Sequence, residues 1–418
     1  MSHTLVTIIC PVAPDNVERA RDAIAALGNP AVERVNIAFE AVADEPGDLA
    51  IHFASLSVFP ATEGGGHLLF EFSADGARAP LIAALAKHLG PLVQDAYALA
   101  ANRGTAPLAD YWTSHIVEVG QGFFDNSGVL FAGTPGLSVR RIRQEVALRE
   151  HLKTLVEEHT GPFTSALAVL ERVRGALEKS STFAWALAAD DVAALQSERT
   201  GIGPYLRIGL NVFRTYLWPL GVPALLALAL ALWADRSAAG ITRAVMAGWD
   251  ALMATLGAAL AALGIAYVVF RKKETRDVPD RRAPDPQKVA AIVARENFHA
   301  HNHLAAVSVI KPGLLRRAAL KAVFAAIAQL ATNLYRPGWL GTLGTIHFAR
   351  WVRVPGTPDL IFLSNYGGSF ESYLEDFITK AHFGLTGVWS NTEGFPRTSN
   401  LVQQIGRASC RERGSDTV

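Results

Sequence analysis

The sequence predicts an α+β fold that contains one strand-and-helix unit twice, with a pair of membrane-spanning helices between the copies. The copies are residues 51–88 and 346–380, and both begin with Ile-His-Phe-Ala. Each continues as an extended segment, a Gly- or Pro-rich turn, a second extended segment, a small-residue turn and a helix. Of the 418 residues 50% are hydrophobic and 18% are charged, which is few charges for a wholly soluble chain. We therefore expect two globular units joined through a membrane segment.

The first unit reads as strand, helix, strand, strand, helix, strand. Residues 5–12 are a β-branched run, and residues 17–27 carry apolar side chains at helical spacing. Residues 51–59 and 67–72 predict a hairpin, residues 79–88 a helix and residues 110–119 a last strand. This order of elements is that of the ferredoxin-like fold.

The second unit repeats this order from residue 304. Residues 304–310 predict a strand and residues 314–335 an apolar helix, and the repeated block follows. The last strand is expected near residue 406, but residues 405–418 have no apolar period and look like a translated sequencing adapter. We therefore expect the natural chain to continue differently after Gln404.

Two uncharged segments, residues 215–234 and 251–270, are each about 20 residues long, the length that spans the hydrocarbon core of a bilayer. Pro219 and Pro223 are expected to kink the first span. The outer flanks of the pair are more basic than the loop at residues 235–250. By the positive-inside rule both termini and both units are cytoplasmic, in a bacterial inner membrane, and the bilayer is the predicted partner. The alternative is two buried core helices.

These assignments divide the chain into five parts. They are a first ferredoxin-like unit (residues 1–119), a loop with a helical hairpin (120–200), a transmembrane hairpin (201–275), a linker (276–298) and a second ferredoxin-like unit (299–404). A formal net charge of +1 gives no basic field that would indicate nucleic acid as a partner. Cys10 and Cys410 are too few for a disulfide framework and lack metal-ligand spacing. A phosphate-binding loop, a nucleophile elbow and a zinc-protease motif are absent from the sequence.

Histidines alternate where the second unit begins. The segment FHAHNH places His299, His301 and His303 at every second position, so on a strand they share one face. Two imidazoles can then share a metal ion, or all three can be ordinary solvated histidines. Because no Cys, Asp or Glu nearby completes a ligand set, no metal is predicted.

His347 and Arg350 are the second candidate pair. In a ferredoxin-like sheet residues 299–303 and 347–350 can meet near one end. On a straight strand His347 and Arg350 face opposite sides, so a bulge is needed to bring them together. His52 repeats His347, which favours a structural role for both histidines, whereas Arg350 has Ser55 as its counterpart. Arg350 is therefore the better candidate for a site confined to one unit.

The turn before the last predicted helix is a third candidate. Ser369 can cap that helix, and a helix N-terminus can hold an anion near Asn365 and Tyr366. A plain capped turn is the alternative.

Two such units packed sheet to sheet resemble the α+β barrel superfamily that includes dye-decolorising peroxidases and chlorite dismutases. The two Ile-His-Phe-Ala copies with their hairpins and helices, about half of the chain, carry the resemblance. It implies a haem held by a histidine, here His303 or His347, with Arg350 stabilising negative charge in peroxidase-like oxidoreductase chemistry. Gly367 stands where the peroxidase GxxDG motif has Asp.

The C-terminal block is also similar to an uncharacterised bacterial membrane-associated family with HFARW and FLSNYDGSW segments. The alternative function is a non-catalytic, membrane-anchored ligand-binding or sensor module that takes a small-molecule ligand.

Overall fold

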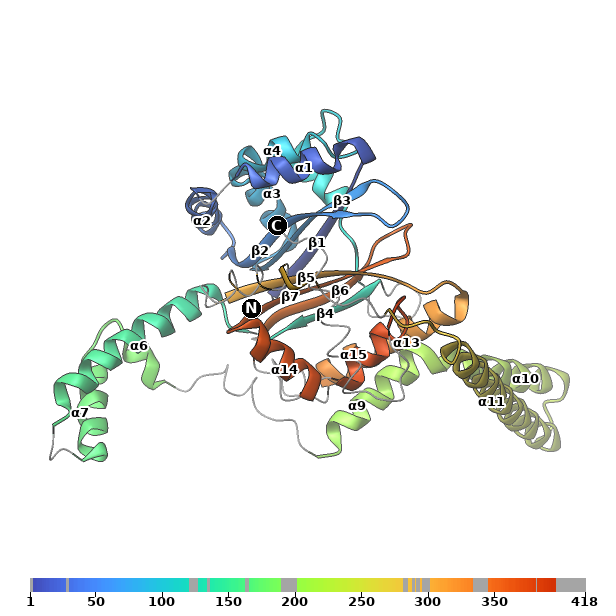
Figure 1. Cartoon of the computed structure of the whole chain (residues 1–418). Coiled ribbons are helices and arrows are strands. Elements are labelled where there is room, and N and C mark those ends of the chain that lie inside the picture. The colour runs from blue at the N-terminus through green and yellow to red at the C-terminus, as the bar shows by residue number, and fades with distance from the viewer. Residues whose placement is uncertain are drawn as a thin grey trace.

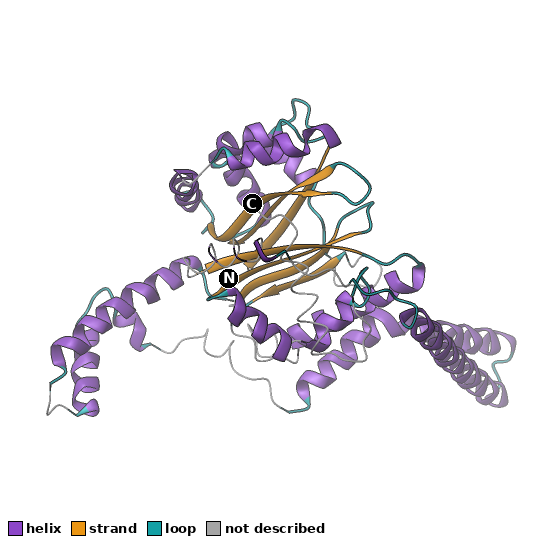
Figure 2. Cartoon of the chain, in the orientation of Figure 1, coloured by secondary structure: helices purple, strands orange, loops and turns teal. Residues whose placement is uncertain are grey.

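The structure is a computed structural model of the chain. It describes residues 3–27, 30–119, 127–133, 136–161, 165–188, 201–280, 301–333, 345–380 and 382–395, with positions 285–287, 290 and 294. His299 and the strand predicted near residue 406 lie outside these residues. The described part is a mixed α+β structure with two antiparallel sheets that face each other and with helices on their outer faces (Figures 1 and 2).

The first sheet has the strand order β1-β3-β2, with β3 in the centre. Its strands are β1 (His3–Val12), β2 (Ala50–Pro60) and β3 (Gly66–Asp75). The helices of this half are α1 (Val17–Ala25), α2 (Pro30–Ala43), α3 (Arg78–His88), α4 (Gly90–Tyr97) and α5 (Leu108–Ser114). One hydrophobic core fills the space between sheet and helices, with Phe70, Phe72 and Trp112 among its buried members.

The second sheet has the strand order β4-β6-β7-β5. Its strands are β4 (Gly128–Ala132), β5 (His301–Val309), β6 (Ile346–Arg353) and β7 (Asp359–Gly367). The helices of this half are α13 (Leu314–Asn333), α14 (Phe370–Lys380) and α15 (His382–Trp389). They cover the face of the sheet that points away from the first sheet (Figure 1).

The two inner faces meet in a layer that we call the inter-sheet core. It contains apolar residues of both sheets and of the segment after α5: Ile9, Phe59, Leu69, Val117, Ala305, Val352, Val354, Ile361 and Leu363. Strand β3 is buried over its whole length because it separates two cores. Its residues alternate accordingly, since Leu68 and Phe70 contact the helices whereas Leu69 contacts the second sheet.

The repeated Ile-His-Phe produces the same irregularity in both sheets. The pairing of β2 with β3 shifts register between Ile51 and Phe53, and the pairing of β6 with β7 shifts between Ile346 and Phe348. His52 and His347 are therefore the extra residues of two β-bulges, which turn their side chains out of the regular alternation. A bulge is needed for His347 and Arg350 to lie on the same face of the sheet, and the structure contains this bulge.

Two predicted elements are wrong, and one helix was not predicted. Residues 110–119 form helix α5 and a single bridge between Ile8 and Ile116 instead of a strand, because Tyr111 and Trp112 are buried together in the first core. The predicted loop at residues 120–135 contains strand β4, which pairs with β6. Helix α2 was not predicted; it begins at Pro30 after α1 has ended at Ala25, because proline is well suited to the first turn of a helix.

Two helical projections leave the sheets on opposite sides (Figure 1). One consists of α6 (Val139–His159), α7 (Ala166–Glu178) and the 3₁₀ turn η2 (Ala184–Leu187). The other begins with α9 (Gly203–Val212), a π turn (Phe213–Leu217) and a 3₁₀ turn (Trp218–Gly221), and continues as α10 (Val222–Ala234) and α11 (Ala238–Glu274). Helices α10 and α11 pack against each other.

In the described part of the chain α11 is the one helix long and apolar enough to cross a membrane, by length and composition. Helix α10 is shorter, because the first predicted span is divided by the irregular turns around Pro219. The predicted loop at residues 235–250 is mostly helical, since Ser237 caps α11 by accepting from the Gly240 N–H.

Candidate functional site

Three groups of polar side chains interrupt the inter-sheet core, and each contains a carboxylate and a histidine. All three contain a residue of β3: His67 lies near Asp359, Glu71 near His303, and Asp75 near His52. Positions 67, 71 and 75 point toward the second sheet because they lie an even number of residues apart on β3. The sequence signal for these groups was the alternation of polar residues in His67–Asp75, inside a segment otherwise typical of a buried strand.

Glu71 and Arg350 form the central group, a buried ion pair between the sheets. Their side chains are 2% and 1% exposed, and Arg350 Nε lies 2.9 Å from Glu71 Oε2. The guanidinium also donates to the carbonyl oxygen of Val6, at 2.8 Å, and to Ser73 Oγ, at 2.6 Å. His303 Nε2 lies 2.5 Å from Glu71 Oε1. Burial alone would raise the pKa of Glu71, but the Arg350 guanidinium and the hydrogen bond from His303 hold it at about 2.

The residues of this group do not fit a haem with Arg350 above the iron. The guanidinium is almost fully buried and is already held by a carboxylate, a hydroxyl and a backbone carbonyl. His303 is engaged with the same carboxylate. The neighbouring positions on β6 and β7, Val352 and Leu363, belong to the closely packed inter-sheet core. Arg350 therefore connects the two sheets.

At one end of the layer lie four histidines and one carboxylate, which we call the histidine cluster: His3, His52, His301, His347 and Asp75. His52 Nε2 donates to Asp75 Oδ1 at 2.9 Å, and His3 Nε2 lies 3.6 Å from the same oxygen. The other carboxylate oxygen accepts from the Val139 N–H at 2.7 Å. These hydrogen bonds lower the pKa of Asp75 although its burial acts in the opposite direction.

The other two histidines of the cluster belong to the second sheet. His301 Nδ1 lies 3.2 Å from His347 Nε2, and the His347 ring stacks on Phe53 of the first sheet. Burial, with the neighbouring His301, lowers the pKa of His347 to about 4. His347 and His301 do meet at one end of the sheet, in agreement with the sequence argument.

The two sheets hold these histidines at equivalent positions. His3 is the register partner of Asp75, and His301 is the register partner of Gly367. The bulges place His52 beside the first pair and His347 beside the second. The second sheet therefore repeats both histidines but has Gly367 where the first has a carboxylate.

A cleft of about 410 Å³ adjoins the histidine cluster between α2, β2 and the start of α6. Asp75 lines it together with the apolar side chains of Phe39, Leu49 and Ile51, and Arg143 stands at its α6 side. Asp75 is thus the member of the cluster that borders this cleft.

The predicted turn site separates into residues with different positions. Tyr366 is fully buried in the second core and stacks on Tyr373 at 4.0 Å between ring centroids. Asn365 is 4% exposed and lies opposite His303 in the sheet register. Ser369 Oγ accepts from the Ser372 N–H, so the prediction of a helix cap is confirmed. Tyr366 and Ser369 thus have clear structural roles.

The principal group that sequence reasoning missed is His3 with His52 and Asp75. Comparison of the chain with protein-family models, curated proteins and solved structures finds no match.

Proposed function

We propose that the chain is a membrane-anchored binding module. In this proposal two ferredoxin-like units packed sheet to sheet hold a ligand at the histidine cluster, and α10 and α11 cross a bacterial inner membrane with both units on the cytoplasmic side. The observation that carries the proposal is the apolar, uncovered surface of α11.

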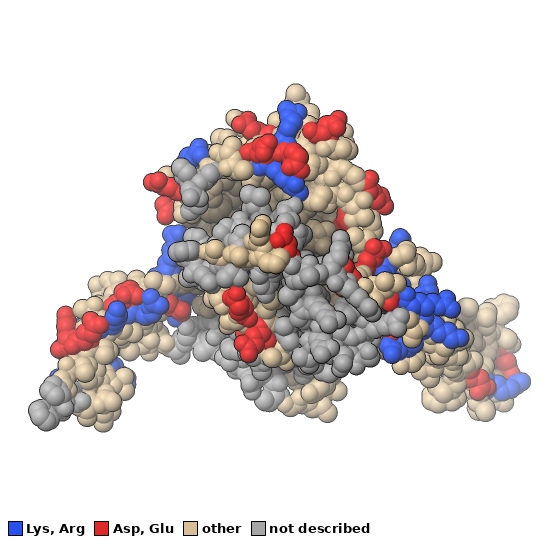
Figure 3. Space-filling view, in the orientation of Figure 1, with Lys and Arg blue, Asp and Glu red and all other residues tan. Residues whose placement is uncertain are grey.

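This surface needs an apolar environment that the described chain does not provide. Leu260, Leu263 and Ile265 are each at least 66% exposed. Figure 3 shows the middle of the α10 and α11 pair almost free of charged side chains, with basic ones gathered where it joins the sheets and a few of both signs at its far end. The basic residues of the last α11 turn are Arg271, Lys272 and Lys273. A hydrocarbon layer bounded by basic residues on the cytoplasmic side satisfies both features.

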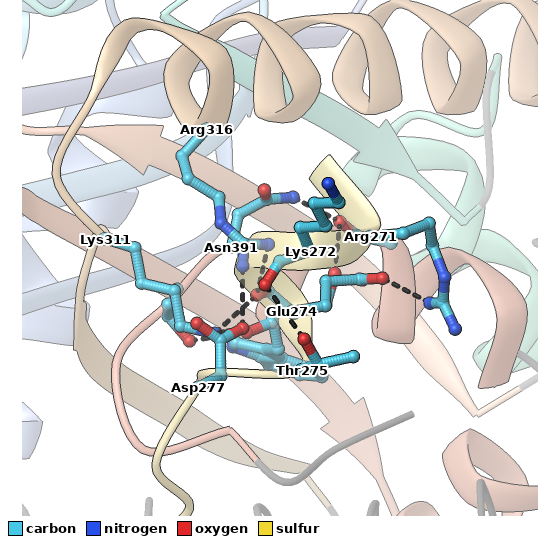
Figure 4. Close-up of polar contacts among 12 residues, drawn as sticks. Arg271, Lys272, Glu274, Thr275, Asp277, Lys311, Arg316 and Asn391 are labelled. Carbon is cyan, nitrogen blue, oxygen red and sulfur yellow. Dashed lines mark hydrogen bonds and ion pairs between the residues drawn. The ribbon is translucent and has the colours of Figure 1, made fainter. Parts of the chain in front are cut away.

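The junction between α11 and the second sheet supports a module that responds to its anchor. Asp277, just after α11, accepts from Lys311 Nζ at 2.8 Å and from an Arg316 guanidinium nitrogen at 2.7 Å (Figure 4). Lys311 also donates to the Ser390 carbonyl oxygen, and the Arg316 guanidinium lies over the Phe270 ring of α11. A displacement of α11 would therefore be transmitted to the second sheet.

The strand orders support the two ferredoxin-like units. In β1-β3-β2 and β5-β7-β6 the first strand of each unit lies beside the third, as that fold requires. A binding role is favoured over haem-dependent oxidation because Arg350 is committed to Glu71, whereas the histidine cluster adjoins a cleft.

Membrane fractionation tests the proposal. The protein should remain in the pellet after alkaline carbonate extraction, and a reporter active only in the periplasm should be active before Ala238 and silent at either end of the chain. Replacing Leu260 and Leu263 by Arg should release it, since each Arg costs about 2.5–3.5 kcal/mol at the centre of a membrane helix. The matched control replaces Leu167 and Leu170 of α7, which are 65% and 62% exposed. Extraction of the unmodified protein by carbonate would refute the anchoring.

A further inference from the structure

The geometry points to a site for a divalent transition-metal ion, with zinc as its first candidate, formed by His3, His52 and Asp75. The inference rests on the proposed binding function and names the class of its ligand.

The donor atoms are already placed at the separations that such an ion requires. One ring nitrogen of each histidine and one carboxylate oxygen all lie within 4.8 Å of one another. Tetrahedral zinc with bonds of about 2.0–2.1 Å holds its donors roughly 3.3 Å apart. The observed distances of 2.9 Å from His52 Nε2 to Asp75 Oδ1 and 3.6 Å from His3 Nε2 to the same oxygen bracket that value. Small side-chain rotations would therefore admit the ion.

Three neighbouring strands hold these donors. Asp75 ends the central strand β3, His3 begins β1 directly opposite it, and His52 is the bulged residue of β2 on the other side. Because both histidines come from paired strands, their positions are fixed by backbone hydrogen bonds. The rings of His3 and His52 each pack on Phe348 of the second sheet, at 5.6 and 5.4 Å between ring centroids. This packing restrains the imidazoles.

The charge of the cluster is incomplete without a cation. The Asp75 side chain is 2% exposed and accepts hydrogen bonds from His52 and from the Val139 N–H. Among the described residues it is within ion-pair distance of two histidines and of no Lys or Arg. Glu71, the comparable carboxylate in the centre of the layer, has Arg350. A buried carboxylate needs a compensating positive charge, and a divalent ion would supply one.

The surroundings match those of known metal sites. The His3 imidazole can offer a ring-nitrogen lone pair to the ion when its other ring nitrogen carries the proton. His3 Nε2 lies 2.9 Å from the Leu137 carbonyl oxygen and would exchange that contact for the ion. The Val139 N–H holds the outer oxygen of Asp75, and such outer contacts orient metal ligands. The cleft that Asp75 lines provides room for a water or a small ligand beside the ion.

Zinc titration of the full-length, detergent-solubilised protein tests the site. After treatment with a chelator and its removal, the protein should bind one zinc ion per chain. His3→Gln, His52→Gln and Asp75→Asn should each weaken binding by about 100-fold or more, since loss of an outer contact alone costs 10–100-fold. The control is His67→Gln, at a buried His–Asp pair without a second histidine, which should leave the affinity within about twofold.

A second measurement uses the unmodified protein alone and does not depend on whether a variant folds. Zinc should raise the unfolding temperature at pH 7.5, and the rise should vanish at pH 5, where protons compete for the imidazoles. Failure of the unmodified protein to bind zinc, or equal affinity in the folded Asp75→Asn variant, would overturn the site. Carbonate extraction is independent of zinc, so the anchoring and the metal site can fail separately.

Discussion

Replacing Arg350 by Met should strongly destabilise the contact between the two sheets. Met keeps the length of the side chain but removes the charge and the donors that contact Glu71, Val6 and Ser73. Glu71, 2% exposed, is then left with a hydrogen bond from His303 and without a permanent cation. Breaking a buried ion pair in this way costs about 3–5 kcal/mol. At about 2–4 °C per kcal/mol the unfolding temperature should fall by roughly 6–20 °C.

Intrinsic tryptophan fluorescence during heating provides the assay, with unmodified protein in the same detergent. The double variant Arg350→Met, Glu71→Gln should lose less than the sum of the two single variants, because it removes both charges. Arg149→Met is the matched control, since the pair of Arg149 with Glu150 is exposed and its loss should leave the unfolding temperature nearly unchanged. An Arg350→Met protein that melts within about 2 °C of the unmodified one would show that this pair does not hold the sheets together.

Three further predictions concern the pH response, the edge strand and the anchor junction. Because the pKa of His347 is about 4 in the folded protein and 6.5 is the ordinary value, the unfolded chain binds the proton first as pH falls. The free energy of unfolding should therefore decrease between about pH 6.5 and 4, and His347→Phe should reduce that slope in chemical denaturation. Gly128→Ala should lower the unfolding temperature by several degrees, since its Cβ would overlap the Trp351 carbonyl oxygen, whereas Gly175→Ala in open space on α7 should not lower it. Asp277→Asn should speed tryptic cleavage at the end of α11, because Lys311 and Arg316 lose their shared carboxylate. An unchanged cleavage rate would show that these ion pairs do not hold the end of α11 in place.

The elements that were predicted from the sequence are those whose pattern is local. Residues 5–12, 51–59 and 67–72 form strands because β-branched and alternating side chains suit a sheet between two cores. Tyr111 and Trp112 show where this fails: aromatic residues favour strands, yet here both are buried at the end of a helix in the first core. Strand β4 was missed because its five residues pair only with β6, more than 200 positions away.

The candidate site was predictable in part for the same reason. His301 and His347 were recognised because they stand out in the sequence, and the strand order β4-β6-β7-β5 places their strands on either side of β7. His3 and Asp75 carry no spacing motif, since they are brought opposite each other by the pairing of β1 with β3. Their only local signal is a carboxylate on the inner face of a buried strand. Arg350 stands out in the sequence, but only the structure shows that its partner is Glu71.

Gly367→Asp should create a second metal site in the other sheet. His301 and His347 already occupy the positions equivalent to His3 and His52, and Gly367 is the register partner of His301 just as Asp75 is of His3. An aspartate there would complete the same three-donor arrangement, so the zinc stoichiometry should rise from one to two per chain. In the Asp75→Asn background the same substitution should restore one ion. Gly356→Asp, in a turn away from the histidines, is the control. If the Gly367→Asp variant folds and binds no additional zinc, two histidines and an aspartate in this strand register do not suffice to bind the ion. The proposed site at His3, His52 and Asp75 would then lose its geometric basis.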